Sequence, residues 1–268
     1  MKINWFSPLL PAKTDIANYT QIIIYYLQEK IDITLWINQQ EWNQALEKYA
    51  KVKQYQLDKM PWFELNQADI NIYHLGNNPT FYGDIWKISQ QSPGLVILHD
   101  DKLQDFFYML YPNKNDYIQQ MRDIYGEKGG KFARLFLNGY YSKEFMAENY
   151  PLTPLALKNA LGVITHNRET YLCLSQQNQW VTAYTPLPYI SDDFRNNKGK
   201  QIPENNYHPQ LYAQAIVEVA KQICEYRHHS GVDRIIQRVA SEFNYLNPNI
   251  PSNSHLTNIS EVIKFITM

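Results

Sequence analysis

Strand-length apolar runs alternate with helical segments over the first two-thirds of the chain, and this alternation limits the fold more than any other feature. The run from residue 94 to residue 98 is apolar throughout, which is typical of a central parallel strand covered on both faces. Short linkers separate the segments. The pattern therefore predicts an α/β fold: a single Rossmann-like, doubly wound parallel sheet with helices on both faces and right-handed crossovers.

The expected strands number about seven and share a short apolar or alternating pattern: 3–7, 31–37, 51–57, 69–75, 94–98, 161–165 and 180–184. Helical spacing predicts helices between them, at 16–27, 40–49, 61–67, 81–89, 103–110, 116–125, 131–138, 153–159 and 168–177. Thr14 or Asp15 can cap the first helix by accepting from its free amides. Gly126, Gly129 and Gly130 separate the helices at 116–125 and 131–138.

The composition changes after residue 190. Residues 191–206 are rich in Asp, Asn, Lys and Pro, which indicates an exposed connector. From residue 208 helical spacing returns, with a predicted break at Gly231 and a last short helix at 259–266. We expect a Rossmann-like domain at 1–190, a connector at 191–206, and C-terminal helices at 207–268 that pack back on the domain, as a C-terminal helical extension.

The composition excludes several function classes. A net charge of −1 opposes nucleic-acid binding and an anionic membrane surface, which need a basic excess. Cys173 and Cys224 are too few for a disulfide framework or a four-cysteine zinc site. No apolar run reaches roughly 18 residues, and the first residues lack signal-peptide architecture, so we expect no membrane span and a cytoplasmic location.

Motifs for common cofactors are absent from the sequence. There is no Gly-x-Gly-x-x-Gly, no Gly-x-x-x-x-Gly-Lys-Ser/Thr and no Gly-x-Ser-x-Gly string. His228 and His229 are adjacent, so they point to different sides of a helix and cannot share a metal ion by themselves. We therefore expect no cofactor and no metal site.

Polar residues follow several of the predicted strands, where ligands bind in open α/β sheets. The candidates are Asn77, Asn78, His99, Asp100, His166 and Asn167. The alternative is that they cap the next helices or satisfy loop backbone, and for Asp100 and Asn167 capping is an equally good interpretation. His99 has a similar alternative, as a strand-end histidine bonded to neighbouring backbone.

Five segments carry a resemblance to a known family: "WFSPLLPAKTDIANYT", "DINIYHLGNNPTFYGDIW", "PGLVILHDDKLQDFF", "MRDIYGEKGGKFA" and "YPLTPLALKNALGVITHN". Their order and joint spacing over residues 1–190 resemble the N-terminal, acceptor-side half of a GT-B glycosyltransferase of the retaining group-1 (family 4) type. The resemblance implies hexosyl transfer from a nucleotide-sugar to a sugar acceptor, which binds mainly on this half.

The resemblance also implies residue roles. It puts His99 beside the transferred sugar and Asp100 where it orients the histidine or the acceptor, as the catalytic pair. It puts the substrate contacts at Lys13, Thr14, Asp15, Asn77, Asn78, His166 and Asn167. Trp86, Tyr82 and Phe81 offer flat apolar faces for a sugar ring, although core packing is the commoner role of such residues.

The sequence departs from the family in two ways. The Glu-x7-Glu pair of the donor half is absent, since Glu218 and Glu225 are one residue too close, and no second set of alternating strands follows. Asp15 also stands where the family has a glycine that admits the donor's phosphates, so its carboxylate opposes a diphosphate. We expect the donor-binding domain to be missing.

Three functions fit these features. The chain is the acceptor-side half of a sugar transferase, acting with a donor domain from a partner or a dimer mate. Alternatively, it is a catalytically inactive carbohydrate-binding module. A third possibility is that the chain is the partner protein of an authentic glycosyltransferase. For the first and third functions, a partner protein or a homo-oligomer covers the former interdomain face, and we expect an apolar surface patch there.

Overall fold

One parallel sheet organises the protein. The computed structural model describes residues 1–27, 31–188 and 208–246, with side chains as far as Arg227. Its strands are β1 (Lys2–Phe6), β2 (Asp32–Ile37), β3 (Lys51–Gln54), β4 (Ile70–Leu75), β5 (Leu95–Leu98), β6 (Gly162–Thr165) and β7 (Val181–Tyr184). They pair in the order β3-β2-β1-β4-β5-β6-β7, every pair parallel. The predicted α/β class with a seven-stranded parallel sheet is confirmed.

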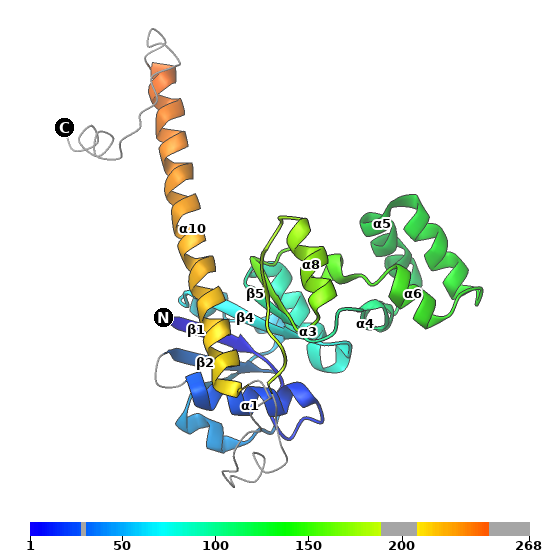
Figure 1. The fold of residues 1–268 in the computed structure, drawn as a ribbon, viewed down its shortest axis with the longest axis horizontal. Helices are drawn as coiled ribbons and strands as arrows, with labels where there is room; N and C mark the ends of the chain where they lie inside the picture. The colour runs from blue at the N-terminus through cyan, green and yellow to red at the C-terminus, as the bar shows by residue number, and fades with distance from the viewer. Residues whose placement is uncertain (28–30, 189–207, 247–268) are drawn as a thin grey trace, which may run out of the picture. The chain divides into compact units, whose positions relative to one another are not determined.

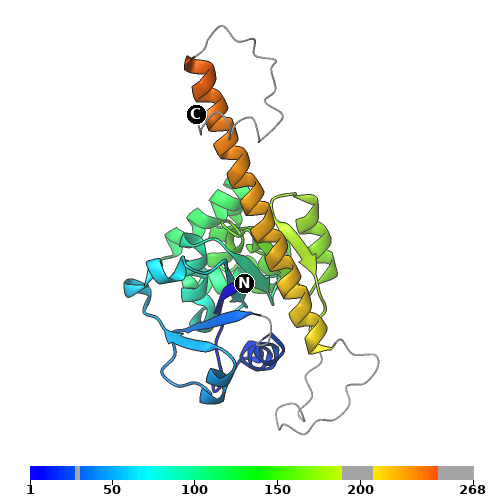
Figure 2. The same ribbon diagram turned by 90° about the vertical axis from the view of Figure 1, so that its left-hand side faces the viewer.

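Helical segments connect the strands: α1 (Asp15–Leu27), η1 (Gln44–Lys48), η2 (Leu57–Lys59), α2 (Trp62–Leu65), α3 (Pro79–Gln91), α4 (Gln104–Leu110), α5 (Lys114–Leu137), α6 (Lys143–Asn149), α7 (Thr153–Ala156) and α8 (Arg168–Gln176). A further helix, α10 (Pro209–Leu246), follows β7. α1 lies on one side of the strands and α3 on the other (Figure 1). The chain divides into two compact units, Met1–Lys221 and Gln222–Met268, and α10 begins in the first of them. The first turns of α10 lie on the same side as α1 (Figure 2). The predicted connector at 191–206 and the predicted helix at 259–266 lie outside the described residues.

The winding of the sheet reverses between β1 and β4. From β1 the chain moves outward to β2 and β3, and then returns to place β4 on the other side of β1. Trp5 is in register with Leu35 of β2 and with Ile72 of β4. At such a reversal, the loops after the two adjoining strands run in opposite directions. They leave a crevice between them at the carboxyl ends of the strands.

Alternation along the strands divides the core between the two faces of the sheet. Phe6, Tyr73 and Leu98 are buried in one large cluster with residues of α3 and α4. Trp5 and His74, their immediate neighbours in the strands, point to the opposite face and are also buried. A slip of one residue in register would exchange the two sets, so burial on both faces specifies the pairing strongly.

A chain of buried amides joins the strands at the reversal. Asn4 Nδ2 donates to Asn71 Oδ1 at 2.8 Å and to the Leu65 carbonyl at 2.7 Å. Trp36 Nε1 donates to Asn4 Oδ1 at 2.8 Å, and Asn71 Nδ2 donates to Ser92 Oγ at 2.8 Å. These bonds connect β2, β1, β4 and the end of α3, and they satisfy polar groups that would be costly to bury alone.

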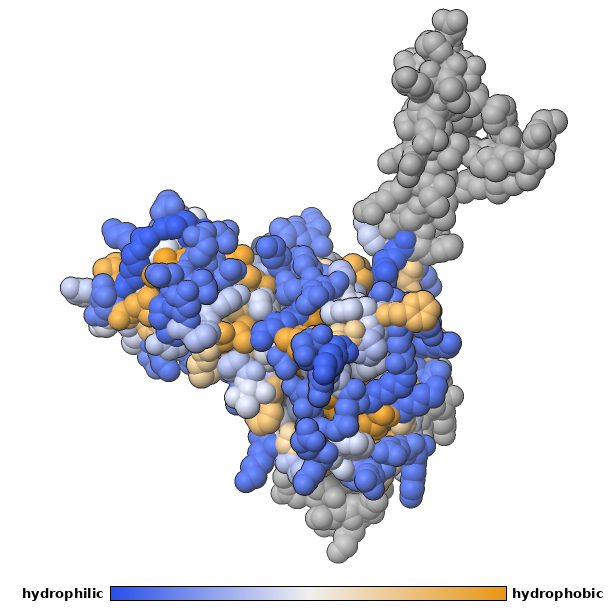
Figure 3. Space-filling view, turned by 180° about the vertical axis from the view of Figure 1, so that it is seen from behind, coloured by the Kyte–Doolittle hydropathy of each residue, from blue (hydrophilic) through white to orange (hydrophobic). Residues whose placement is uncertain are grey.

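The excursion between β5 and β6 is a helical arm closed by aromatic side chains. Phe132 of α5 stacks on Phe145 of α6, with ring centroids 6.0 Å apart, and contacts Tyr141 at 5.1 Å. Phe132 and Phe145 are only partly buried, and Figure 3 shows hydrophobic side chains between polar ones over the part of the molecule that carries α5 and α6. The sequence did not predict α6, which begins where Ser142 Oγ accepts from the Phe145 amide.

Two predictions from glycines need correction. The predicted break at Gly231 is wrong, because α10 continues from Pro209 to Leu246; a glycine inside a helix costs only about 1 kcal/mol relative to alanine. In α5 only Gly126 departs from helical geometry, with φ 67° and ψ −163°. Gly129 and Gly130 lie within the following helix, and a Cβ on Gly129 would meet the Met121 carbonyl at 2.2 Å. Close packing therefore explains Gly129.

Substituting Asn4 should destabilise the protein markedly. Asn4→Leu leaves the Trp36 N–H and the Leu65 carbonyl buried without their partner, so we expect the free energy of unfolding to fall by about 3 kcal/mol. Urea denaturation followed by circular dichroism measures this loss. Asn66→Leu, at an exposed position after α2, is the matched control and should change stability by under about 0.5 kcal/mol. Equal losses in the two variants would contradict a stabilising role for the amide chain.

Candidate functional site

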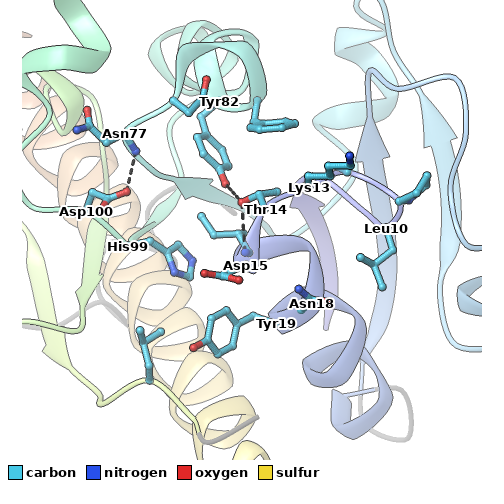
Figure 4. Close-up of a pocket in the computed structure, with 16 residues that line it drawn as sticks. Leu10, Lys13, Thr14, Asp15, Asn18, Tyr19, Asn77, Tyr82, His99 and Asp100 are labelled. Carbon is cyan, nitrogen blue, oxygen red and sulfur yellow. Dashed lines mark hydrogen bonds between the residues drawn. The ribbon is translucent and has the colours of Figure 1, made fainter. Parts of the chain in front are cut away.

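A cleft of about 680 Å³ lies where the winding of the sheet reverses. Its walls come from residues between 10 and 19, after β1 and at the start of α1, from residues 77–82 after β4, and from His99 and Asp100 after β5 (Figure 4). Leu187, in the segment after β7, completes the lining. The cleft thus occupies the position at which open α/β sheets bind ligands.

The loop after β1 is held in place by the Gln39 side chain and the Asn43 backbone, both of which follow β2. Gln39 pairs with the Leu9 backbone, accepting from its amide at 2.8 Å and donating to its carbonyl at 2.9 Å. The Asn43 amide donates to the Leu10 carbonyl at 2.8 Å. The segment after β2 therefore fixes the position of this wall of the cleft.

Thr14 joins two walls of the cleft. The Ile16 amide donates to Thr14 Oγ1 at 3.4 Å, so Thr14 caps α1 and Asp15 occupies its first turn. The same oxygen lies 2.5 Å from the Tyr82 hydroxyl of α3 (Figure 4). Burial raises the pKa of Tyr82 to about 12, with Asp100 and Asp15 adding to the shift and the Thr14 hydrogen bond opposing it. Tyr82 is therefore a neutral phenol at pH 7.

The turn after β4 is built around Asp100. The Asn77 amide donates to Asp100 Oδ2 at 2.7 Å, and Asn77 Oδ1 accepts from the Phe106 amide at 2.9 Å. Asn78 caps α3 by accepting from the Thr80 amide at 3.0 Å. The side-chain oxygens of Asn77 and Asn78 are thus used within the fold, which leaves their amide N–H groups as donors for a ligand.

Three histidines form a row at the carboxyl ends of β4, β5 and β6. His74 Nδ1 lies 2.9 Å from His99 Nε2, and the rings of His99 and His166 are 5.0 Å apart. His166 Nδ1 donates to the Thr185 carbonyl at 2.8 Å, and its Nε2 lies 3.4 Å from the Tyr212 hydroxyl of α10. His99 is the histidine of this row that lines the cleft.

The pKa of each histidine in the row is lowered. Burial is the main cause for His74, whose pKa falls to about 3, and a charge on His166 would lower it further. Burial also lowers the pKa of His99 well below 6.5, followed by the effects of His74 and His166. The pKa of His166 falls because of burial, against the opposing effect of its bond to Thr185. All three are neutral at pH 7, so His99 offers the cleft a neutral ring.

The structure brings most of the candidate residues together. The cleft wall includes Lys13, Thr14, Asp15, Asn77, Asn78, His99 and Asp100. His166 is not on the wall but contacts the His99 ring, and Asn167 is not on it either. Asn167 caps α8 and donates to Asp101 Oδ2 at 3.0 Å, as its alternative interpretation held. Trp86 is buried against Phe107, whereas Phe81 and Tyr82 line the cleft.

Sequence reasoning missed His74, Asn18 and Tyr19. His74 lies inside β4, among mostly apolar residues, so no local pattern marks it as a site residue. It lies two residues before Gly76, on the same face of the sheet as His99. Asn18 and Tyr19 lie one turn after Asp15 in α1, at positions i+3 and i+4, so they share its face of the helix and line the cleft with it.

The charge of the wall favours a neutral or cationic ligand over an anion. Its ionised side chains are Lys13, Asp15 and Asp100, of which only Lys13 is a cation. In the described part of the chain, no group of three His, Cys, Asp or Glu residues is arranged to hold a metal ion. His74 and His99 hydrogen-bond directly, at 2.9 Å, which is shorter than the roughly 3.4 Å between two nitrogens on a tetrahedral zinc.

Comparisons with known proteins give one weak likeness. No family model and no curated protein matches the chain. Among solved structures, apo UGT2 of Phytolacca americana superposes with a TM-score of 0.33 and 10% sequence identity, over 72% of this chain and 54% of that one. The chain thus spans about half the length of that protein, and at this TM-score the likeness assigns no family. Within the described residues, no helix combines the length and apolar character needed to cross a membrane.

Acid should destabilise the protein through the histidine row. Below about pH 6.5 the unfolded chain protonates His74 whereas the folded chain does not, so the unfolded state binds more protons. The free energy of unfolding should therefore fall by about 1.4 kcal/mol per pH unit for this residue as the pH drops from 6.5 towards 3. Urea denaturation at a series of pH values measures the slope.

The contribution of His74 is separated by substitution. His74→Phe should reduce the slope below pH 6.5 by about 1.4 kcal/mol per pH unit, because one of the three titrating histidines is gone while His99 and His166 remain. Ile72→Val, on the same strand and face, should shift the whole curve without changing its slope. A slope that stays the same in His74→Phe would contradict a depressed pKa for His74.

Proposed function

We propose that the cleft binds a carbohydrate acceptor and that the chain is the acceptor-side half of a sugar transferase. The observation that carries the proposal is the lining of the cleft at the reversal of the sheet: amide and hydroxyl groups and a neutral His99, with two carboxylates against one cation, Lys13. Such a wall suits a polyhydroxylated ligand with no charge of its own.

The available groups match the chemistry of hydroxyls. A sugar hydroxyl both donates and accepts, and the wall offers donors at Asn77 and Asn78 and an acceptor at Asp100, which keeps one oxygen beyond its bond to the Asn77 amide. Phe81 and Tyr19, both half-buried, offer ring faces for the apolar side of a sugar. A volume of about 680 Å³ lies within the usual range for small-molecule sites.

The resemblance of residues 1–190 to acceptor domains of GT-B enzymes implies that a sugar is transferred at this binding site. It implies His99 beside the transferred sugar and Asp100 orienting the histidine or the acceptor, and both residues line the cleft. Lys13 alone does not neutralise a diphosphate beside Asp15 and Asp100. The groups that hold the donor would therefore come from outside the described residues, as from a partner chain or a second copy.

A second candidate is carbohydrate binding without catalysis. Asp15 stands at the first position of α1, where helix amides would otherwise meet a phosphate. An exposed carboxylate at this position repels a sugar nucleotide but not a free glycoside. In this candidate the cleft binds the carbohydrate but no sugar nucleotide.

Binding and turnover separate the two candidates. We expect the protein to bind one or more members of a panel of methyl glycosides, measured by titration calorimetry. His99→Ala and Asp100→Asn should each weaken that binding about tenfold or more, the equivalent of one lost hydrogen bond of about 1.4 kcal/mol. Asn66→Ala, at an exposed site after α2, should leave it unchanged.

The same panel is then incubated with sugar nucleotides and with any co-purifying protein. Glycoside transfer that His99→Ala abolishes, with folding retained, would support the transferase. Glycoside binding without turnover would favour the binding module. Failure of the wild-type protein to bind any glycoside of the panel would contradict both candidates.

A further inference from the structure

His74 is a buried histidine whose hydrogen bond leads to the cleft. It is 1% exposed and packs on Trp5, with ring centroids 4.7 Å apart. Its Nδ1 is 2.9 Å from His99 Nε2, while its Nε2 is buried and has no partner among the described residues. Neither the sheet nor the wall of the cleft needs an imidazole here, so the pairing itself calls for an explanation.

The other nitrogen of His99 faces different surroundings. His99 Nδ1 has no hydrogen-bond partner in the described part of the chain, yet it is not among the buried polar atoms that lack one. His99 also lines the cleft (Figure 4). Nδ1 is therefore the nitrogen that a ligand in the cleft can reach.

Both rings are neutral, so one proton lies between Nδ1 of His74 and Nε2 of His99, and either histidine can be its donor. If His99 donates, His74 carries its own proton on Nε2 and buries an N–H without an acceptor. Trp5, on whose ring His74 packs, already holds a buried Nε1–H without a partner, so this arrangement adds a second unsatisfied donor to the same pair of rings. If His74 donates, its Nε2 carries no proton and the pair of rings holds one unsatisfied N–H instead of two. The second arrangement therefore buries fewer N–H donors without an acceptor.

We infer that His74 is a positioning residue that donates its Nδ1 proton to His99 Nε2 and so presents His99 to the cleft as an Nδ1–H donor. The ligand atom at His99 is then a hydrogen-bond acceptor, such as a hydroxyl or ring oxygen. His99 does not accept a proton from the ligand at this nitrogen, so a base for an acceptor hydroxyl would be Asp100. The assignment of the ligand as a sugar rests on the proposed function, whereas the position of the proton does not.

Nitrogen-15 spectra of the histidine rings test the inference directly. In the uniformly labelled full chain at pH 7, long-range proton–nitrogen correlations show which ring nitrogen carries the proton. We expect His99 to be protonated at Nδ1 and unprotonated at Nε2, with its signals assigned by their loss in His99→Gln. A His99 ring protonated at Nε2 in the wild-type protein would overturn the inference.

Substitutions separate positioning from packing. His74→Phe keeps an aromatic ring on Trp5 but removes the donor, so the His99 signals should move towards the Nε2–H form. His74→Asn keeps an N–H near the Nδ1 position and should restore the Nδ1–H form, and it also serves if the phenylalanine variant does not fold. Ile97→Val, the register neighbour of His74, loses packing alone and should leave the His99 signals unchanged. An unchanged His99 spectrum in His74→Phe would contradict the inference.

A glycoside titration keeps this inference distinct from the proposed function. With a methyl glycoside that binds, we expect affinity to fall about 3- to 10-fold in His74→Phe and to recover in His74→Asn. If His99 is an Nδ1–H donor but no glycoside binds, the proposed function fails and the role of His74 stands. If glycosides bind and His99 carries its proton on Nε2, the role of His74 fails and the proposed function stands.

Discussion

The parallel pairing of β1 with β4 is the interaction on which the rest of the structure depends. It reverses the winding of the sheet, so the loops after these two strands leave on different sides and open the cleft between them. The buried amides of Asn4 and Asn71 meet across this pair and admit one register, because a shift of one residue would leave both without partners. The location of the cleft is thus a consequence of how two strands pair.

The same register determines the chemistry of the cleft. His74, His99 and His166 fall on one face at the ends of adjacent strands, and burial keeps their rings uncharged. A neutral ring beside Asn77 and Asp100 forms hydrogen bonds but supplies no positive charge to a phosphate. The cleft therefore differs from the nucleotide sites of many α/β proteins, where helix amides and cations gather around anions.

Much of this fold could be predicted from the sequence, because apolar runs and their breaks report local structure. The seven strands lie within a few residues of their predicted positions. The strand-end residues Asn77, His99 and Asp100 line the cleft, and their roles towards a ligand stay predictions. Local patterns say less about partners across the sheet. For Asn167 the sequence left ligand binding and helix capping equally open, and the residue caps α8; nothing in the local pattern marked His74, which lies in bonding distance of His99.

Errors at glycines have a similar origin. A glycine permits a break in a helix without requiring one, so Gly231 continues α10 while Gly126 turns the backbone of α5. The predicted domain boundaries at residues 190 and 207 remain predictions, since they fall within or beside residues outside those described.

We propose that a neutral polyhydroxylated ligand binds where the sheet reverses its winding. Backbone amide spectra recorded during titration with methyl glycosides are the decisive test. We expect shifts to concentrate in residues 10–19, 77–82 and 99–100, which form the walls of the cleft. Shifts confined to α5 and α6, or none with any glycoside, would contradict it.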